Sequence, residues 1–301
     1  MAAPLTASAL PRALACPASC ALPAVSSTSD EAERGTQVHA FMQAIADGTP
    51  VDEALAAVAE ATRALCAKIN LAHVPRGGET EVAMAWDVDA RRARRLEVDG
   101  HRQYEPTATE IPGTADLVLW LDRPVVIDWK TTSHDFDARS AVPQLEHYAL
   151  CVANIAWADE VECAVGVIAD DGAVEWSRWR MDAAALDRAA DRARRVWERV
   201  QSARAHQGEH DVTLGNHCRY CPSWRACPAH VRAVRQLAAG EVPAITAESI
   251  GAAYSVARAV EKSAEAVREG IKRFVSEHGP VKTGNQLVSL NKRGALSLRT
   301  L

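Results

Sequence analysis

Long apolar runs are absent from this sequence. No uninterrupted apolar stretch approaches the roughly 20 residues that a membrane-spanning helix needs. The first 25 residues are rich in Ala, Leu and Ser, but they lack the basic start of a signal peptide, and Pro11-Arg12 interrupts their apolar part. We therefore expect a cytoplasmic protein with no membrane partner.

A strong net charge is also absent. The formal net charge is −5, which provides no bulk attraction to nucleic acid. DNA binding would need local basic patches, and the candidates are Arg91–Arg95 and a C-terminal tail with Lys282, Lys292, Arg293 and Arg299. Solvated surface is the simpler interpretation of either run.

Internal repeats and long low-complexity linkers are absent too, so the 301 residues form one large domain or two small ones. Periodicity and turn residues predict an alternation of helices and strands, which is typical of an α/β fold. The expected helices span about 30–47, 51–69, 137–157, 182–206 and 247–278. The expected strands span about 81–88, 96–104, 115–121, 125–130, 161–169, 173–180, 281–290 and 295–301.

Charged residues interrupt two otherwise apolar strands within Gly113–Lys130. Asp116 lies at the start of the first strand, and Asp128 and Lys130 lie at the end of the second. Burying an unpaired charge is expensive, so each of these residues needs a partner or a metal. Side chains alternate along a strand, so Asp128 and Lys130 share one face and Trp129 takes the other. A buried salt bridge between Lys130 and an aspartate is the simpler alternative.

A pair of carboxylates suits a hard divalent cation such as Mg²⁺ or Mn²⁺. The backbone carbonyl of Trp129 is a natural additional ligand. Such a metal polarises a phosphoryl oxygen and lowers the pKa of a bound water, and Lys130 would position that water or neutralise developing charge. Glu81 is either a further acidic group near this site or an exposed carboxylate at a strand edge.

Two helices carry polar residues whose simplest roles are structural. His39 lies beside an apolar stripe, where a lone histidine is usually structural. Gln144 and Tyr148 are four residues apart and therefore lie on one helix face, where ordinary helix surface is the simplest interpretation.

A family resemblance changes these interpretations. Gly113-Thr114-Ala115-Asp116, Ile127-Asp128-Trp129-Lys130 and Gln144-x-x-x-Tyr148 resemble successive motifs of the PD-(D/E)XK nucleases, specifically the RecB-like branch. The resemblance covers about residues 8 to 230. It implies a restriction-endonuclease-like core, with a central mixed β-sheet flanked by helices. It also implies the following roles: His39, Asp116, Asp128 and the Trp129 carbonyl hold the metal, Lys130 is catalytic with the two aspartates, and Gln144 and Tyr148 line the DNA path.

The cysteines suggest a second metal centre. Cys218-x₂-Cys221-x₅-Cys227 supplies three thiolates, and a zinc ion could add His217 or His230. A [4Fe–4S] cluster needs four cysteines. The spacing resembles the iron–sulfur subgroup of RecB-like nucleases, which includes the AddB nuclease domain and the CRISPR-adaptation exonuclease. That resemblance implies a cluster with Cys16 as the fourth ligand, and Cys20 is its competitor.

The remaining expectations concern domains and function. Cys66, Cys151 and Cys163 lie in apolar contexts and are expected to be inert core residues. Residues 1–230 would form the nuclease core with its cluster, and 231–301 would pack on the same domain. The expected activity is a Mg²⁺- or Mn²⁺-dependent deoxyribonuclease. It would be an exonuclease on single-stranded DNA or duplex ends, in recombination, repair or phage replication, with a recombination or helicase partner. The rival is a catalytically silent DNA-binding or assembly subunit.

Overall fold

Two compact units make up the chain. The computed structural model describes residues 4–25, 30–97, 104–131, 138–206, 212, 214–218, 221–241, 245–291 and 294–300. Unit 1 is Met1–His210 and unit 2 is Asp211–Leu301. The expected domain boundary lay at residue 230. By compactness the units divide after His210, which places the cysteine segment 218–227 in unit 2. The expected nuclease core of residues 1–230, with 231–301 packed on it, stays a prediction.

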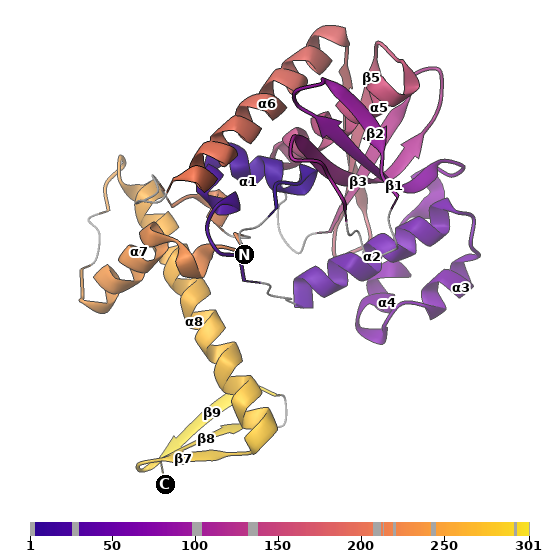
Figure 1. Ribbon diagram of the computed structural model, residues 1–301. Coiled ribbons are helices and arrows are strands. Elements are labelled where there is room, and N and C mark those ends of the chain that lie inside the picture. The colour runs from indigo at the N-terminus through magenta and orange to yellow at the C-terminus, as the bar shows by residue number, and fades with distance from the viewer. Residues whose placement is uncertain are drawn as a thin grey trace. The chain divides into compact units, whose positions relative to one another are not determined.

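A six-stranded sheet forms the centre of unit 1, in the order β2-β1-β3-β4-β5-β6 (Figure 1). Only β4 and β5 pair in parallel, and the other neighbours are antiparallel, so the sheet is mixed. This confirms the expected α/β class with a central mixed sheet. The strands are β1 (Glu79–Asp87), β2 (Arg92–Arg95), β3 (Glu110–Leu119), β4 (Val125–Thr131), β5 (Val161–Ile168) and β6 (Val174–Met181).

Helices cover both faces of this sheet. Since β4 and β5 are parallel, the chain must cross over between them, and α5 makes that connection. With α1 and α6 it covers one face, whereas α2, α3 and α4 lie on the other (Figure 1). The helices are α1 (Leu10–Ala15), α2 (Asp30–Ala46), α3 (Val51–Ala56), α4 (Glu60–Cys66), α5 (Val142–Ala156) and α6 (Ala183–Ala205).

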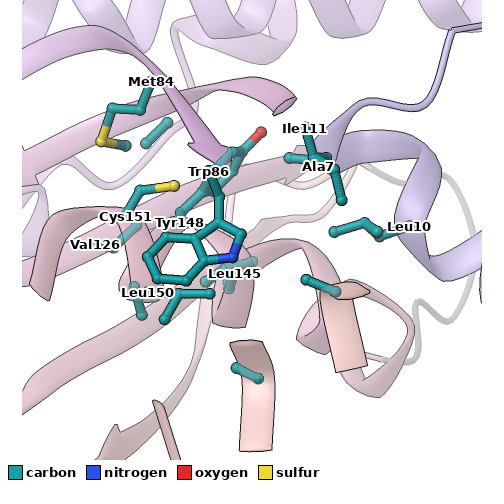
Figure 2. Close-up of a cluster of buried hydrophobic side chains, with 14 of the residues drawn as sticks. Ala7, Leu10, Met84, Trp86, Ile111, Val126, Leu145, Tyr148, Leu150 and Cys151 are labelled. Atoms are coloured by element: carbon teal, nitrogen blue, oxygen red, sulfur yellow. The ribbon is translucent and has the colours of Figure 1, made fainter. Parts of the chain in front are cut away.

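The larger core cluster fills the space between the sheet and α5. Trp86 of β1 packs there with Leu145, Tyr148 and Leu150 of α5 (Figure 2). The N-terminal segment closes the same cluster, since Ala7 and Leu10 are buried beside Ile111 of β3 (Figure 2). This packing anchors the helix that carries Gln144 and Tyr148.

The second core cluster lies between the sheet and α2. Val38, Phe41, Met42 and Ile45 of α2 pack onto it, as their helical spacing predicts. Trp129 of β4 is buried in the same cluster and meets Trp176 edge to face, with ring centroids 5.1 Å apart. A Cβ atom on the neighbouring Gly166 would lie 2.4 Å from the Trp129 ring, so the absence of a side chain there makes room for the indole.

Three local expectations were wrong. The single strand expected at 281–290 is a hairpin, Val281–Thr283 paired with Gln286–Leu290, because the chain turns at Gly284, whose φ is 60°. The strand expected at 96–104 is absent from its described residues, and β1 pairs on that edge with the preceding segment, β2 (Arg92–Arg95). There Arg94 and Arg95 form ion pairs with Glu110 and Glu79. The helix expected at 51–69 is two helices, α3 and α4, because the chain turns between them to bury Val58 in the α2-side cluster.

Unit 2 combines helices with a small antiparallel sheet. The sheet order is β7-β8-β9. The elements are α7 (Pro228–Ala238), α8 (Ile250–His278), β7 (Val281–Thr283), β8 (Gln286–Leu290) and β9 (Leu296–Thr300). Among the residues that the structure describes, no helix of either unit is long and apolar enough to cross a membrane.

Candidate active site

Asp116 lies where the regular alternation of β3 is interrupted. Ala115 packs into the α5-side cluster, but Leu117, two residues on, packs into the α2-side cluster. The residue opposite Asp116 in the antiparallel register is Glu81, whose φ is 51° and which is left out of the ladder. A left-handed conformation costs energy for a residue other than glycine. Asp116 therefore lies where β3 switches its packing from one face of the sheet to the other.

His39 reaches Asp116 from the α2 face. Its Nδ1 lies 3.3 Å from Asp116 Oδ1. The other carboxylate oxygen, Oδ2, accepts a 2.7 Å hydrogen bond from the backbone N–H of Trp129. Asp116 is therefore fixed between α2 and β4, with 6% of its surface exposed, whereas the His39 side chain remains 24% exposed.

Asp128 and Lys130 form a close pair from the other face. Lys130 Nζ lies 2.6 Å from Asp128 Oδ2, so the ion pair expected as the simpler alternative is present. Asp128 is only 1% exposed, but the Lys130 side chain is 25% exposed. The two basic side chains, His39 and Lys130, are therefore partly exposed, whereas both carboxylates are buried.

Gln144 links this pair to Tyr148. Its Nε2 donates to Asp128 Oδ1 and to the Tyr148 hydroxyl oxygen, each at 3.0 Å, and its Oε1 accepts from Lys130 Nζ at 3.2 Å. Gln144 and Tyr148 are 8% and 3% exposed. Both side chains thus lie within the site's own hydrogen-bond network, and their expected role in lining a DNA path stays a prediction.

The four titratable groups shift one another's pKa values. Burial lowers the pKa of His39, but attraction to Asp116 outweighs this and raises it above the usual value. Burial raises the pKa of Asp116, yet His39 and Lys130 together bring it below its usual value. The pKa of Asp128 is raised, first by burial and then by repulsion from Asp116, against the opposing attraction of Lys130. The balance between burial and the basic neighbours therefore differs for the two carboxylates: it favours the charged form of Asp116 and disfavours that of Asp128.

The donor set fits a hard divalent cation in its chemistry. The carboxylates from β3 and β4 are ligands that Mg²⁺ and Mn²⁺ prefer, and the His39 imidazole from α2 adds a nitrogen donor beside Asp116. Within the described ranges, no three His, Cys, Asp or Glu side chains are already placed at ligand distances from one point. Lys130 and His39 instead supply the positive charge that the buried carboxylates require.

The basic run Arg91–Arg95 is largely neutralised. Three of its arginines form ion pairs: Arg91 with Asp187 and Asp191, Arg94 with Glu110, and Arg95 with Glu79. In the C-terminal tail, Lys282 and Arg299 are exposed on β7 and β9, and Lys292 and Arg293 lie outside the described residues.

The cysteines divide between the units. Cys16 and Cys20 are buried in unit 1, whereas Cys218, Cys221 and Cys227 belong to unit 2. A hydrogen bond from the Cys221 N–H to the Cys218 carbonyl, at 3.2 Å, closes a turn between those two. The four-cysteine ligand set stays a prediction, as does the choice between Cys16 and Cys20.

The other three cysteines are buried and free. Cys66, Cys151 and Cys163 all lie in the core. Burial raises the pKa of the Cys66 thiol to about 11 and raises those of Cys151 and Cys163 further, which disfavours the reactive thiolate. These properties agree with the expected inert role.

Fold and site together define a class. A mixed sheet flanked by helices presents two buried carboxylates and a lysine on adjacent strands, an arrangement suited to metal-assisted hydrolysis. The family model described as the PD-(D/E)XK nuclease superfamily matches residues 4–228, and the chain belongs to that superfamily. Membership indicates a metal-dependent nuclease.

Comparison with individual proteins adds little. No curated protein matches the chain. Seven chains of solved structures match, and one is titled "Crystal structure of SSO0001". It is 22% identical to this chain, and the TM-score is 0.32. The match covers 50% of this chain and 60% of that one.

Proposed function

We propose that the protein is a Mg²⁺- or Mn²⁺-dependent deoxyribonuclease that removes nucleotides from DNA ends, acting on single-stranded DNA or duplex ends. Its setting would be recombination, repair or phage replication, with a recombination or helicase protein as partner. The observation that carries the proposal is the burial of two carboxylates on adjacent strands, each beside a partly exposed basic side chain, His39 or Lys130. Burying two like charges is expensive and is typical of sites that bind cations.

The metal ligands in this proposal are His39, Asp116, Asp128 and the backbone carbonyl of Trp129. A divalent cation held there would polarise a phosphoryl oxygen and activate a water. Asp116 is oriented by His39 and the Trp129 N–H, and Asp128 by Gln144. Lys130 is the accessible cation of the set, so it would contact the attacking water or the charge that develops on the phosphate.

A thiolate-bound metal centre is the second part of the proposal. It is a [4Fe–4S] cluster on Cys16, Cys218, Cys221 and Cys227, as in the iron–sulfur branch of RecB-like nucleases, and structural zinc is the alternative. Thiolates are the ligands that zinc and iron–sulfur clusters take. Two of the four cysteines, Cys218 and Cys221, are joined by a backbone hydrogen bond. The role would be structural.

The decisive experiment is a cleavage assay on end-labelled single-stranded DNA with Mn²⁺ or Mg²⁺. Wild-type protein should degrade linear strands, lose this activity in EDTA, and leave circular single strands intact if it is an exonuclease. Lys130→Ala should abolish cleavage. The matched control is Lys68→Ala, which removes an exposed lysine of the same unit and should cut normally.

The rival function, a silent DNA-binding subunit, has a distinct outcome. Wild-type protein would then bind labelled DNA but cut it with neither metal. Cleavage that persists in Lys130→Ala at the wild-type rate would instead contradict the assigned role of the lysine, even though the protein is a nuclease.

A further inference from the structure

One lysine of α8 fastens the cysteine segment of unit 2. Lys262 Nζ donates to the backbone carbonyls of Cys218 and Cys221, both at 3.2 Å. Those carbonyls belong to the two ends of the turn that the Cys221 N–H closes. The Lys262 ammonium therefore binds the backbone at both ends of the turn. These two hydrogen bonds do not involve the cysteine sulfur atoms.

The next residue of α8 makes a second attachment. Ser263 Oγ lies 2.7 Å from His230 Nε2, on the helix that begins directly after Cys227. Trp224, between Cys221 and Cys227, lies against both groups: its ring is 5.8 Å from Lys262 Nζ and 5.1 Å from the His230 ring. Lys262 is half-buried at this position. The middle of α8 is thus part of the cysteine segment's own structure, although the family match ends at residue 228.

In unit 1, basic side chains likewise donate hydrogen bonds to backbone carbonyls near Cys16. Arg199 Nη1 donates to the carbonyl of Leu14, in the last turn of α1, at 3.1 Å. Arg204 Nε donates to the carbonyl of Cys20, also at 3.1 Å. Both arginines come from α6, and their two acceptors flank Cys16. In both units, then, basic side chains bind backbone carbonyls that belong to a cysteine or lie within two residues of one.

We propose that Lys262 is a positioning residue of the thiolate-bound metal centre: it shapes the Cys218–Cys221 turn through its carbonyls and offsets the negative charge of the thiolates. The proposal rests on the metal centre proposed above. A thiolate-bound metal carries net negative charge, and burying it is favoured by a nearby fixed cation. An ammonium bound to carbonyls supplies that cation without competing for sulfur. Arg199 and Arg204 would serve the unit 1 segment in the same way.

The test measures metal in the full-length protein, purified without oxygen. We compare wild type with Lys262→Met, which removes both hydrogen bonds at similar side-chain length, and with Lys262→Arg, which keeps the charge. Lys272→Met is the matched control, because Lys272 is a half-buried lysine of the same helix that pairs with Glu269 and binds no cysteine carbonyl among the residues that the structure describes. Iron and zinc per chain are measured by elemental analysis, and the rate of metal release to a chelator is followed by absorbance. Circular dichroism checks that each variant is folded.

Lys262→Met should lose metal about 10–100-fold faster than wild type, the range found when outer-shell partners of a metal site are removed. Lys262→Arg should recover most of the retention, and Lys272→Met should match wild type. Equal release from wild type and Lys262→Met would overturn the role of Lys262 and leave the centre intact. Wild-type protein without iron or zinc would overturn both proposals. If Lys262→Met does not fold, Lys262→Gln, which keeps a donor but loses the charge, takes its place: faster release than from Lys262→Arg supports the charge requirement, and release at the rate of Lys262→Arg contradicts it.

Discussion

Gln144 is the best place to test whether the site is a single hydrogen-bonded unit. Its amide donates to Asp128 and to Tyr148 and accepts from Lys130. Gln144→Ala removes all three bonds at once. Because Asp128 and Tyr148 are buried, their oxygen atoms would lose a donor in a place that bulk water reaches poorly.

The cost can be worked out bond by bond. A hydrogen bond to a buried charged group contributes about 1.5–3 kcal/mol, and a neutral one about 0.5–1.5 kcal/mol. The hydrogen bond from Lys130 is left out of this sum, because the Lys130 ammonium is partly exposed and water can replace the Gln144 amide. Gln144→Ala should therefore reduce the free energy of unfolding by about 3 kcal/mol. For a unit of this size, that lowers the melting temperature by roughly 6–12 °C.

Urea and thermal unfolding of three variants would measure this. Tyr148→Phe removes only the neutral bond and should cost about 1 kcal/mol. The matched control is Gln201→Ala, a partly exposed glutamine on α6 that should change stability by less than about 0.5 kcal/mol. With DNA, Gln144→Ala and Tyr148→Phe should lower the cleavage rate, because Asp128 and Lys130 lose their orientation, while the affinity for single-stranded DNA stays near wild type.

The opposite pattern would refute this reasoning. If Gln144 and Tyr148 mainly line the DNA path, their variants should bind DNA more weakly than wild type. Their urea unfolding midpoints should equal that of wild type. A loss of less than about 1 kcal/mol for Gln144→Ala would likewise show that the network does not stabilise the fold.

Three further predictions concern pH and packing. Burial lowers the pKa of His147 to about 4, so this imidazole stays neutral in the fold and protonates on unfolding. Its contribution to stability is present above about pH 6.5 and is lost as pH falls, by about 2 kcal/mol between about pH 7 and pH 5. Urea unfolding should show this slope in wild type but not in His147→Gln. A Cβ on Gly113 would lie 2.5 Å from Ala7 Cβ and 2.8 Å from Tyr148 Cε1, so Gly113→Ala should cost about 1–3 kcal/mol in thermal unfolding. Since the pKa of His39 is raised, Mn²⁺ must displace its proton. The measured Mn²⁺ affinity should rise with pH through that pKa, and His39→Ala should flatten the dependence.

Much of the fold could be predicted because its signals are local. The apolar stripe of α2 and the apolar strands β3 and β4 follow from the spacing of neighbouring residues. Charged residues inside apolar strands are a local signal too, and they mark Asp116, Asp128 and Lys130 as the candidate site. Such residues are rarely placed there without a compensating partner.

The site's detailed contacts could not be predicted, because they join segments far apart in the chain. No local pattern indicates that the Trp129 N–H binds Asp116, or that the arginines of 91–95 pair with acids on β1, β3 and α6. Lys262 was also missed. It lies in a helix with an ordinary charge pattern, and the carbonyls that it binds are more than 40 residues away in the chain.

By itself, the sequence determined the candidate residues Asp116, Asp128 and Lys130, since residue type and period-two alternation are local properties. It placed Asp128 and Lys130 on one face, and they pair there at 2.6 Å. Only the tertiary structure decided how His39, from the opposite face of the sheet, reaches Asp116. The alternation breaks at Asp116, opposite the left-handed Glu81, and such a break arises from the pairing of β1 with β3 rather than from either strand alone.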